Sequence, residues 1–188
     1  MDRRELERLL SHPEWQAKYS EFMPRVWAKM RELRVRDGVR DAVPWVRSLP
    51  GVLAVKYRTP APTPGWSVKF QDGTSVIWLD ASIRGSRHEQ FVCCHEAAHH
   101  LFHPPGMYVV CEGDRDKEQI YEIQANWAAS ELKMPSWRLR RLAVQWEFNV
   151  HRLAREFNLS REVVSYRVGA LVRRLRRKGA LPNRCPKC

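Results

Sequence analysis

The hydrophobic positions at the start of the chain repeat at helical spacing. They are Trp15, Tyr19, Phe22, Val26, Met30 and Leu33. Pro24 lies within this run and is expected to kink or split the helix, because proline has no backbone N–H to donate. Asp37-Gly38 ends the pattern, and a second short helix is predicted over 39–49.

The pattern changes from helical to extended after Pro50-Gly51. Three short segments rich in β-branched and aromatic residues predict strands over 52–57, 66–70 and 75–80. Asp72-Gly73 lies between the last two and is typical of a hairpin turn.

Helical spacing returns after residue 86 and continues to the end of the chain. Helices are predicted over 87–103, 117–132 and 136–146, and two more on either side of the segment 157–160. Pro104-Pro105 stops the first of them, and the segment that follows, up to residue 116, is expected to be a loop. The chain therefore divides into an N-terminal helical segment (1–49), a mixed core (50–135) and a helical region (136–188).

Composition and charge narrow the class of protein. A hydrophobic content of 44% is enough for a real core, and no apolar run is long enough for a membrane span. The five cysteines are an odd number and two of them are adjacent, which indicates reduced thiols and a cytoplasmic location. Residues 138–188 hold 14 Lys or Arg and 3 Asp or Glu, so nearly all of the net charge of +12 lies there. Such a segment suits nucleic acid or an acidic partner, although it is also compatible with a solvated basic face.

One short motif carries candidate chemistry. His95, Glu96 and His99 form a His-Glu-x-x-His sequence within the predicted helix 87–103. Residues four apart share a helix face, so both imidazoles can reach one zinc ion, and Glu96 can act on a water at that ion without binding it. Two histidines at this spacing also occur on ordinary helices, so the motif alone is not decisive.

A third ligand is expected, because hydrolytic zinc sites use three protein ligands and leave one position open. Glu122 and Asn126 lie four residues apart on the next predicted helix. Glu122 can be the third ligand, and Asn126 can hydrogen-bond to a ligating histidine from behind.

Two segments, HEAAHHLFH and EIQANWAASELKMP, together resemble the ImmA/IrrE-type zinc metallopeptidases. The resemblance covers roughly residues 50–170 and implies an α+β, zincin-like core that binds one zinc through His95, His99 and Glu122. It implies that Glu96 is the catalytic base of peptide-bond hydrolysis, and that the substrate is a helix-turn-helix repressor, cut to relieve repression. The residue that assists at the oxyanion stays open among His103, Tyr108 and Tyr121, although the pattern favours His103 as a surface histidine near the helix end. Cys93 and Cys94 are expected to be buried structural residues.

The basic C-terminal region contains a pattern typical of a helix-turn-helix unit, Leu153 to Val168. Asn158 suits a left-handed turn and Ser160 suits a helix N-cap. The predicted nucleic-acid contacts are Arg161, Ser165, Arg167, Arg173, Arg174, Arg176, Arg177 and Lys178. The same helices suit a structural or protein-docking role, and both interpretations stay open.

The last four residues, Cys185 to Cys188, form a Cys-x-x-Cys. This pair supplies only two of the four ligands of a structural zinc, so we expect free thiols in a tail.

Two other functions of the whole protein also fit the sequence. One is a DNA-binding regulator whose metal site is non-catalytic, and the other is a SprT-like protease that acts on DNA-bound proteins.

Overall fold

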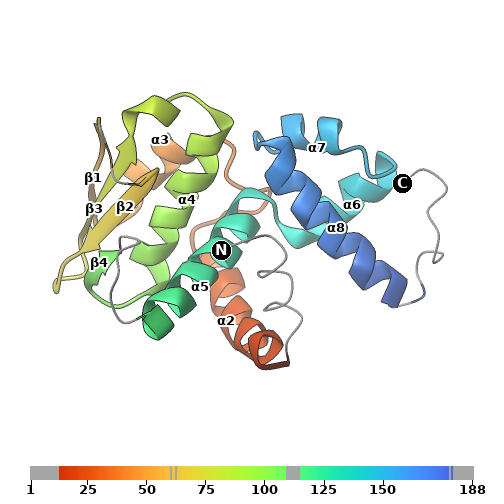
Figure 1. Cartoon of the computed structure of the whole chain (residues 1–188), viewed down its shortest axis with the longest axis horizontal. Helices are drawn as coiled ribbons and strands as arrows, with labels where there is room; N and C mark the ends of the chain where they lie inside the picture. The colour runs from red at the N-terminus through yellow and green to blue at the C-terminus, as the bar shows by residue number, and fades with distance from the viewer. Residues whose placement is uncertain (1–12, 60, 62, 109–114, 178, 180–188) are drawn as a thin grey trace.

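The chain folds as a small sheet covered by helices, with a further group of helices at the opposite end (Figure 1). This computed structural model describes residues 13–59, 61, 63–108, 115–177 and 179. Those residues form seven α-helices, one 3-10 helix (η1, Ala81–Ile83) and four strands, which confirms the α+β class. None of these helices is long and apolar enough to span a bilayer.

The N-terminal helices belong to the main hydrophobic core. Helix α2 spans Pro13–Glu32 and buries Phe22, Met23 and Val26, and α3 spans Ala42–Arg47. The expectation that Pro24 might split α2 was wrong. Pro24 is exposed, and the buried side chains on either side of it hold the helix together across the missing hydrogen bond.

The sheet is mixed and has the order β1-β3-β2-β4. Strands β1 (Val52–Arg58) and β3 (Ser75–Asp80) are parallel, and β2 (Gly65–Lys69) is antiparallel to β3. Gly73 has a φ of 84°, which glycine adopts without strain, and it closes the β2–β3 hairpin. Strand β4 (Gly106–Tyr108) lies within the segment that we expected to be a loop, and it pairs with β2 at the edge of the sheet.

Helix α4 (Arg87–Phe102) lies between the sheet and helix α5 (Arg115–Lys133), as Figure 1 shows. Its N-cap is Ser86, whose hydroxyl accepts a hydrogen bond from the Glu89 N–H. A helix covered on two sides must have small residues where it meets its neighbours. Small residues of both helices are buried in one core: Cys93, Cys94, Ala97 and Ala98 on α4, and Ala125, Ala128 and Ala129 on α5. The close approach of α4 and α5 brings the polar residues of both helices together.

The last three helices form a second hydrophobic core. They are α6 (Ser136–Gln145), α7 (Val150–Glu156) and α8 (Arg161–Arg177). Their buried side chains include Leu139, Leu142, Leu153, Phe157, Leu159, Val164 and Val168.

A buried ion pair connects the two cores. Glu131 on α5 is 2% exposed, and its carboxylate lies 3.1 Å from the Arg167 guanidinium on α8. Arg167 also donates to the Met134 carbonyl and the Ser136 hydroxyl. The Glu131 carboxylate accepts further hydrogen bonds from Ser136 and from the Trp27 indole. These donors compensate the cost of burying both charges.

Candidate metal centre

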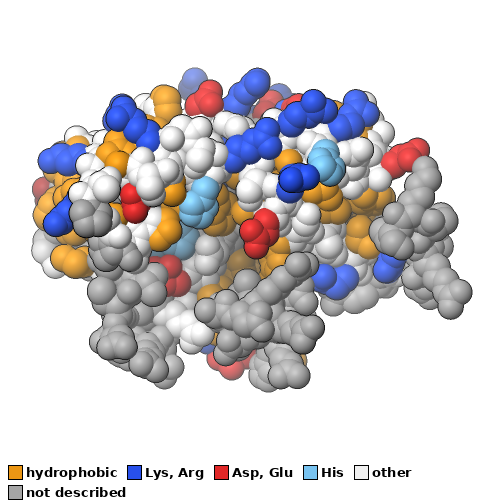
Figure 2. All heavy atoms as spheres, turned by 45° about the horizontal axis from the view of Figure 1, so that its top comes forward, with side chains coloured by type: hydrophobic (Ala, Val, Ile, Leu, Met, Phe, Trp, Pro, Cys, Tyr) orange, Lys and Arg blue, Asp and Glu red, His pale blue; other side chains and the backbone are white. Residues whose placement is uncertain are grey.

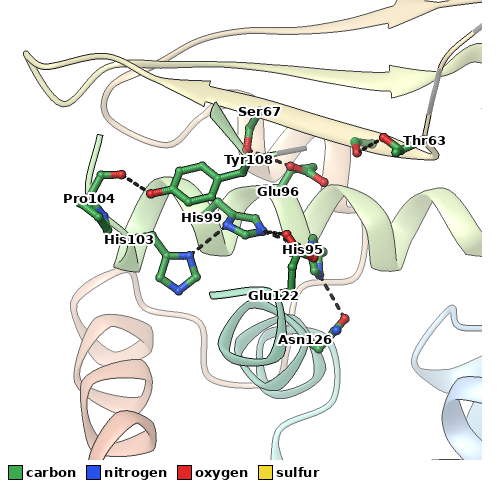
Figure 3. Close-up of polar contacts among 11 residues, drawn as sticks. Thr63, Ser67, His95, Glu96, His99, His103, Pro104, Tyr108, Glu122 and Asn126 are labelled. Carbon is green, nitrogen blue, oxygen red and sulfur yellow. Dashed lines mark hydrogen bonds and ion pairs between the residues drawn. The ribbon is translucent and has the colours of Figure 1, made fainter. Parts of the chain in front are cut away.

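Three side chains from two helices converge on one point (Figure 3). His95 and His99 extend from the same face of α4, and their Nε2 atoms lie 3.1 Å apart. Glu122 on α5 directs one carboxylate oxygen at each: Oε2 lies 3.1 Å from His95 Nε2 and Oε1 lies 3.2 Å from His99 Nε2. Among the described residues, this is the group of metal-ligating side chains close enough together to share an ion.

The charges of the group suit a cation. Burial disfavours ionisation of Glu122, but the two histidines outweigh it and hold the pKa of its carboxyl below the usual range. Burial lowers the pKa of His99, which favours the neutral imidazole that a metal requires. Burial also opposes protonation of His95, but the Glu122 and Glu96 carboxylates outweigh that effect and raise its pKa. A cation would compete with this proton for the His95 Nε2.

Asn126 lies behind His95, as the i, i+4 spacing from Glu122 predicted. The Asn126 Oδ1 is 3.1 Å from His95 Nδ1 (Figure 3). An amide oxygen can only accept, so His95 carries its proton on Nδ1 and keeps the lone pair of Nε2 directed at the site.

His103 has the same relation to His99. Its Nδ1 lies 3.0 Å from His99 Nδ1, on the side of the ring away from Glu122 (Figure 3). Burial lowers the pKa of His103 to about 3, so its imidazole is neutral and can accept the His99 Nδ1–H. The surface position that we considered for His103 was wrong, because the residue is 3% exposed and packs against Phe22. The sequence shows only that His103 directly follows the last turn of α4, and it does not show that Phe22 of α2 packs against its ring.

Glu96 is held beside the group by the sheet. It is 4% exposed, and its Oε2 accepts a hydrogen bond of 2.8 Å from the Ser67 hydroxyl on β2 (Figure 3). Burial raises the pKa of Glu96 to about 7, which suits a group that must both take and release a proton near neutrality. A β-carbon at Gly65 would lie 2.5 Å from Val92 Cγ1 and 3.1 Å from Glu96 Oε1, so only glycine leaves room here. Neither Ser67 nor Gly65 gave any signal in the sequence, because strand register decides what they face.

Two tyrosines lie beside the same group. The Tyr108 ring on β4 stacks on His99 at 4.4 Å between ring centres, and its hydroxyl donates to the Pro104 carbonyl. Tyr121 packs against His103 at 4.8 Å. Burial raises the pKa of Tyr108 to about 12, so its hydroxyl stays protonated and able to donate.

The donor set fits zinc. Two imidazoles and one carboxylate are a common ligand set of hydrolytic zinc sites, in which a fourth position stays open. The Glu122 side chain is 28% exposed while that of His99 is 1% exposed, so solvent reaches the group at Glu122 rather than at His99.

The family model of the IrrE N-terminal-like domain, a peptidase family, matches residues 53–168. The chain belongs to this family. It is thus a metallopeptidase of the ImmA/IrrE type, and the match spans α4, α5 and all three proposed ligands. A comparison with curated proteins gave no match.

The basic residues of this ImmA/IrrE-type chain do not all lie where we expected. Arg161 and Ser165 on α8 are exposed, as are Arg173 and Arg174, and Arg176 is half-buried. Arg167 does not fit the predicted nucleic-acid contact, because its guanidinium is bound to Glu131 inside the molecule. The side chain of Arg177, as well as Lys178 and Cys185–Cys188, lies outside the described residues.

The remaining candidates around the motif are structural. Cys93 and Cys94 are buried, and burial raises the pKa of both thiols, that of Cys94 to about 12, so they are thiols rather than thiolates. His100 contacts the Ser75 hydroxyl and the Pro50 carbonyl with its two ring nitrogens, and so joins α4 to the sheet.

Proposed function

We propose that this chain is a zinc-dependent endopeptidase of narrow specificity that cleaves a DNA-binding repressor. The convergence of His95, His99 and Glu122 within 4.8 Å of one another carries the proposal, together with the family match. These three side chains would hold one Zn²⁺. When bound, the ion would supply a Lewis acid that polarises the scissile carbonyl and lowers the pKa of water.

The other residues would handle the proton. Glu96, ionised above its pKa of about 7, takes a proton from the attacking water and passes it to the leaving amine nitrogen. The hydrogen bond from Ser67 fixes the direction of its carboxylate. Asn126 and His103 hold the rings of His95 and His99 from behind, so that each Nε2 faces the reaction. Tyr108 contacts His99 and Tyr121 contacts His103, so both tyrosines stay candidates to serve at the oxyanion.

The edge of the sheet supports the choice of a polypeptide substrate. Strand β4 is an edge strand next to His99, and Met107 on it is 70% exposed. An extended peptide can add to such an edge through main-chain hydrogen bonds. A flexible linker or exposed helix of a helix-turn-helix repressor, opened to an extended backbone, would meet this requirement.

Two measurements test the proposal. Purified protein should hold about one zinc per chain, and His95→Ala, His99→Ala and Glu122→Ala should each lose it. The zinc-loaded protein should cut the repressor encoded nearest to its gene at one or a few bonds, mapped by mass, and should leave casein intact. Glu96→Gln should keep zinc and lose the cut.

Other outcomes would favour other functions. Equal derepression in cells by the parent and by Glu96→Gln would make the chain a non-catalytic, metal-sensing regulator. Cleavage of many DNA-bound proteins would favour the SprT-like alternative. A zinc content unchanged in Glu122→Ala would mean that the third ligand is misassigned.

We further propose that the helices α6–α8 contact nucleic acid and that the encounter with the repressor takes place on DNA in the cytoplasm. Asn158 has a φ of 50° between α7 and α8, and the Ser160 hydroxyl accepts from the Val163 N–H at the start of α8, as in a helix-turn-helix unit. Arg161 and Ser165 are exposed on the first turns of α8. Lys and Arg side chains also gather along the part of the surface that α7 forms (Figure 2).

Salt dependence separates this proposal from a structural role. Affinity for duplex DNA should fall steeply as salt rises, because each neutralised phosphate releases counterions. Removing residues from Arg173 onward should weaken binding to all sequences alike, whereas Arg161→Ala and Ser165→Ala should alter base preference. Absence of binding at low salt would leave α6–α8 as a docking surface for the substrate protein.

A further inference from the structure

A pocket separate from the candidate metal centre lies where the end of α2 and the loop after it meet the start of α6. It has a volume of about 530 Å³, a size suited to a small organic ligand. Its lining residues are Trp27, Met30, Val35, Pro135 and Trp137, which are apolar, Arg31, Arg34 and Arg36, which are cationic, and Glu131. None of them belongs to the candidate metal centre.

Two indole rings in this pocket are fixed in place but remain exposed. Trp27 is 41% exposed and Trp137 is 47% exposed, which is unusual for the largest apolar side chain. The Trp27 Nε1 donates to Glu131 Oε1 at 3.2 Å, and the Trp137 Nε1 donates to the Arg36 carbonyl at 3.3 Å. The rings are therefore held by their nitrogens while part of each ring surface is open to a ligand.

The pocket is strongly cationic. Arg31, Arg34 and Arg36 are exposed, and none of them forms an ion pair with a carboxylate of another described residue. The carboxylate of Glu131 is paired with the Arg167 guanidinium and accepts two hydrogen bonds from Ser136, so it does not neutralise these three arginines. Within the part of the chain that the structure describes, no ion pair neutralises the three guanidinium groups, so they give the pocket a positive potential.

The backbone at Arg34 gives an independent reason to assign a role to this side chain. Arg34 has a φ of 56°, in the left-handed region, and it ends α2 where the Val35 N–H bonds back to the Met30 carbonyl. Glycine is the residue that this helix-ending geometry favours. An arginine here strains the backbone and places a guanidinium in the pocket.

We propose that this pocket binds a nucleotide, with its base against the indole of Trp27 or Trp137 and its phosphate on the arginines. Bases stack on aromatic side chains, and guanidinium groups form bidentate hydrogen bonds with phosphate. A free nucleotide and a nucleotide within single-stranded DNA offer the same chemistry. An acidic peptide would satisfy the arginines, but its carboxylates do not come with the flat ring that two anchored indoles suit.

Calorimetric titration of the full-length, zinc-loaded protein with dTMP tests this proposal. We expect Arg34→Gly to weaken binding roughly tenfold, through the loss of one charged phosphate contact. Its melting temperature should be equal to or above that of the parent, because the strain at this position is relieved. Trp137→Leu should weaken binding roughly 5- to 100-fold through lost stacking. Arg87→Ala is the matched control: it removes an exposed arginine that does not line the pocket and should leave binding unchanged.

Further ligands identify the source of the nucleotide and can overturn the proposal. Binding of a short oligothymidylate that is tighter than that of dTMP, and that Arg34→Gly also weakens, would identify single-stranded DNA as the source. Equal affinity for the two would identify a free nucleotide. Inorganic phosphate binding as tightly as dTMP would contradict the role of the indoles. An acidic peptide that binds where dTMP does not, or no binding of dTMP at all, would overturn the proposal.

Discussion

Replacing Ser67 by alanine tests the geometry around the proposed catalytic base. The Ser67 hydroxyl donates to Glu96 Oε2 at 2.8 Å, and the two residues are 1% and 4% exposed. Burial raises the pKa of Glu96 to about 7, and this hydrogen bond opposes the rise by stabilising the ionised form. Ser67→Ala should therefore raise the pKa further and move the acidic limb of the pH–activity profile to higher pH.

The size of the shift follows from the energy of the hydrogen bond. A buried hydrogen bond to a charged group stabilises by about 1.5–3 kcal/mol. The protonated carboxyl can also contact the hydroxyl, so roughly half of that energy, about 0.8–1.5 kcal/mol, distinguishes the two forms. This corresponds to about 0.6–1.1 pKa units, or a loss of activity of about four- to twelvefold well below the pKa and little loss well above it. A bound cation would lower the pKa in both proteins and leave the difference between them.

The direct assay is a carboxyl ¹³C NMR titration of the metal-free protein, in which the spectrum of Glu96→Gln identifies the resonance. The pH dependence of kcat/KM is the second readout once a substrate is in hand. Ser75→Ala is the matched control, because it removes another buried hydroxyl from the sheet, one that contacts His100 instead. If Glu96 titrates at the same pH in Ser67→Ala and in the parent, the contact does not set its pKa, and the reasoning fails.

Three further predictions concern other contacts. His103→Ala should weaken zinc binding roughly 10- to 100-fold, measured by competition with a chelator, because the His99 ring loses its hydrogen-bond partner; exposed His88→Ala should have no effect. Arg167→Met should lower the free energy of unfolding by roughly 3 kcal/mol in urea titrations, because it leaves a buried carboxylate unpaired; a change below about 1 kcal/mol would contradict that account. Gly65→Ala should keep zinc but lose most of the peptidase activity, because its β-carbon displaces the proposed base; full activity would show that the strand can shift without consequence.

Local patterns in the sequence predicted the parts of the site that lie on single helices. The i, i+4 spacings of His95 with His99 and of Glu122 with Asn126 depend only on helix geometry, and the structure brings both pairs together. Their roles in binding zinc stay predictions. The family resemblance, drawn from these same residues, is confirmed by the match to residues 53–168.

The same local patterns could not predict contacts between segments that are distant in the sequence. Ser67 faces Glu96 because of strand register. Strand β4 forms because its three residues pair with the edge of β2, which lies far from them in the sequence. Arg167 was misplaced for a related reason. Its position on an amphipathic helix suggested solvent, whereas its guanidinium reaches the buried Glu131 carboxylate on α5, which requires a positive partner. Neither arrangement follows from the residues of one element alone.

The pairing of Glu131 with Arg167 has a consequence for anyone who wishes to isolate the peptidase part of this chain. A natural place to cut is after Pro135, between the two hydrophobic cores. Such a fragment would keep Glu131 and Met134, which are 2% and 0% exposed in the whole chain, but lose Arg167 and Ser136, which bind the Glu131 carboxylate. Without α6–α8, the buried end of α5 and the neighbouring Met134 would face water, which favours aggregation or a loosened α5, the helix that also carries Glu122 and Asn126. Shortening this protein to a minimal protease therefore requires redesign of the surface that α6–α8 cover, and loss of activity on truncation is not evidence that the removed helices take part in catalysis.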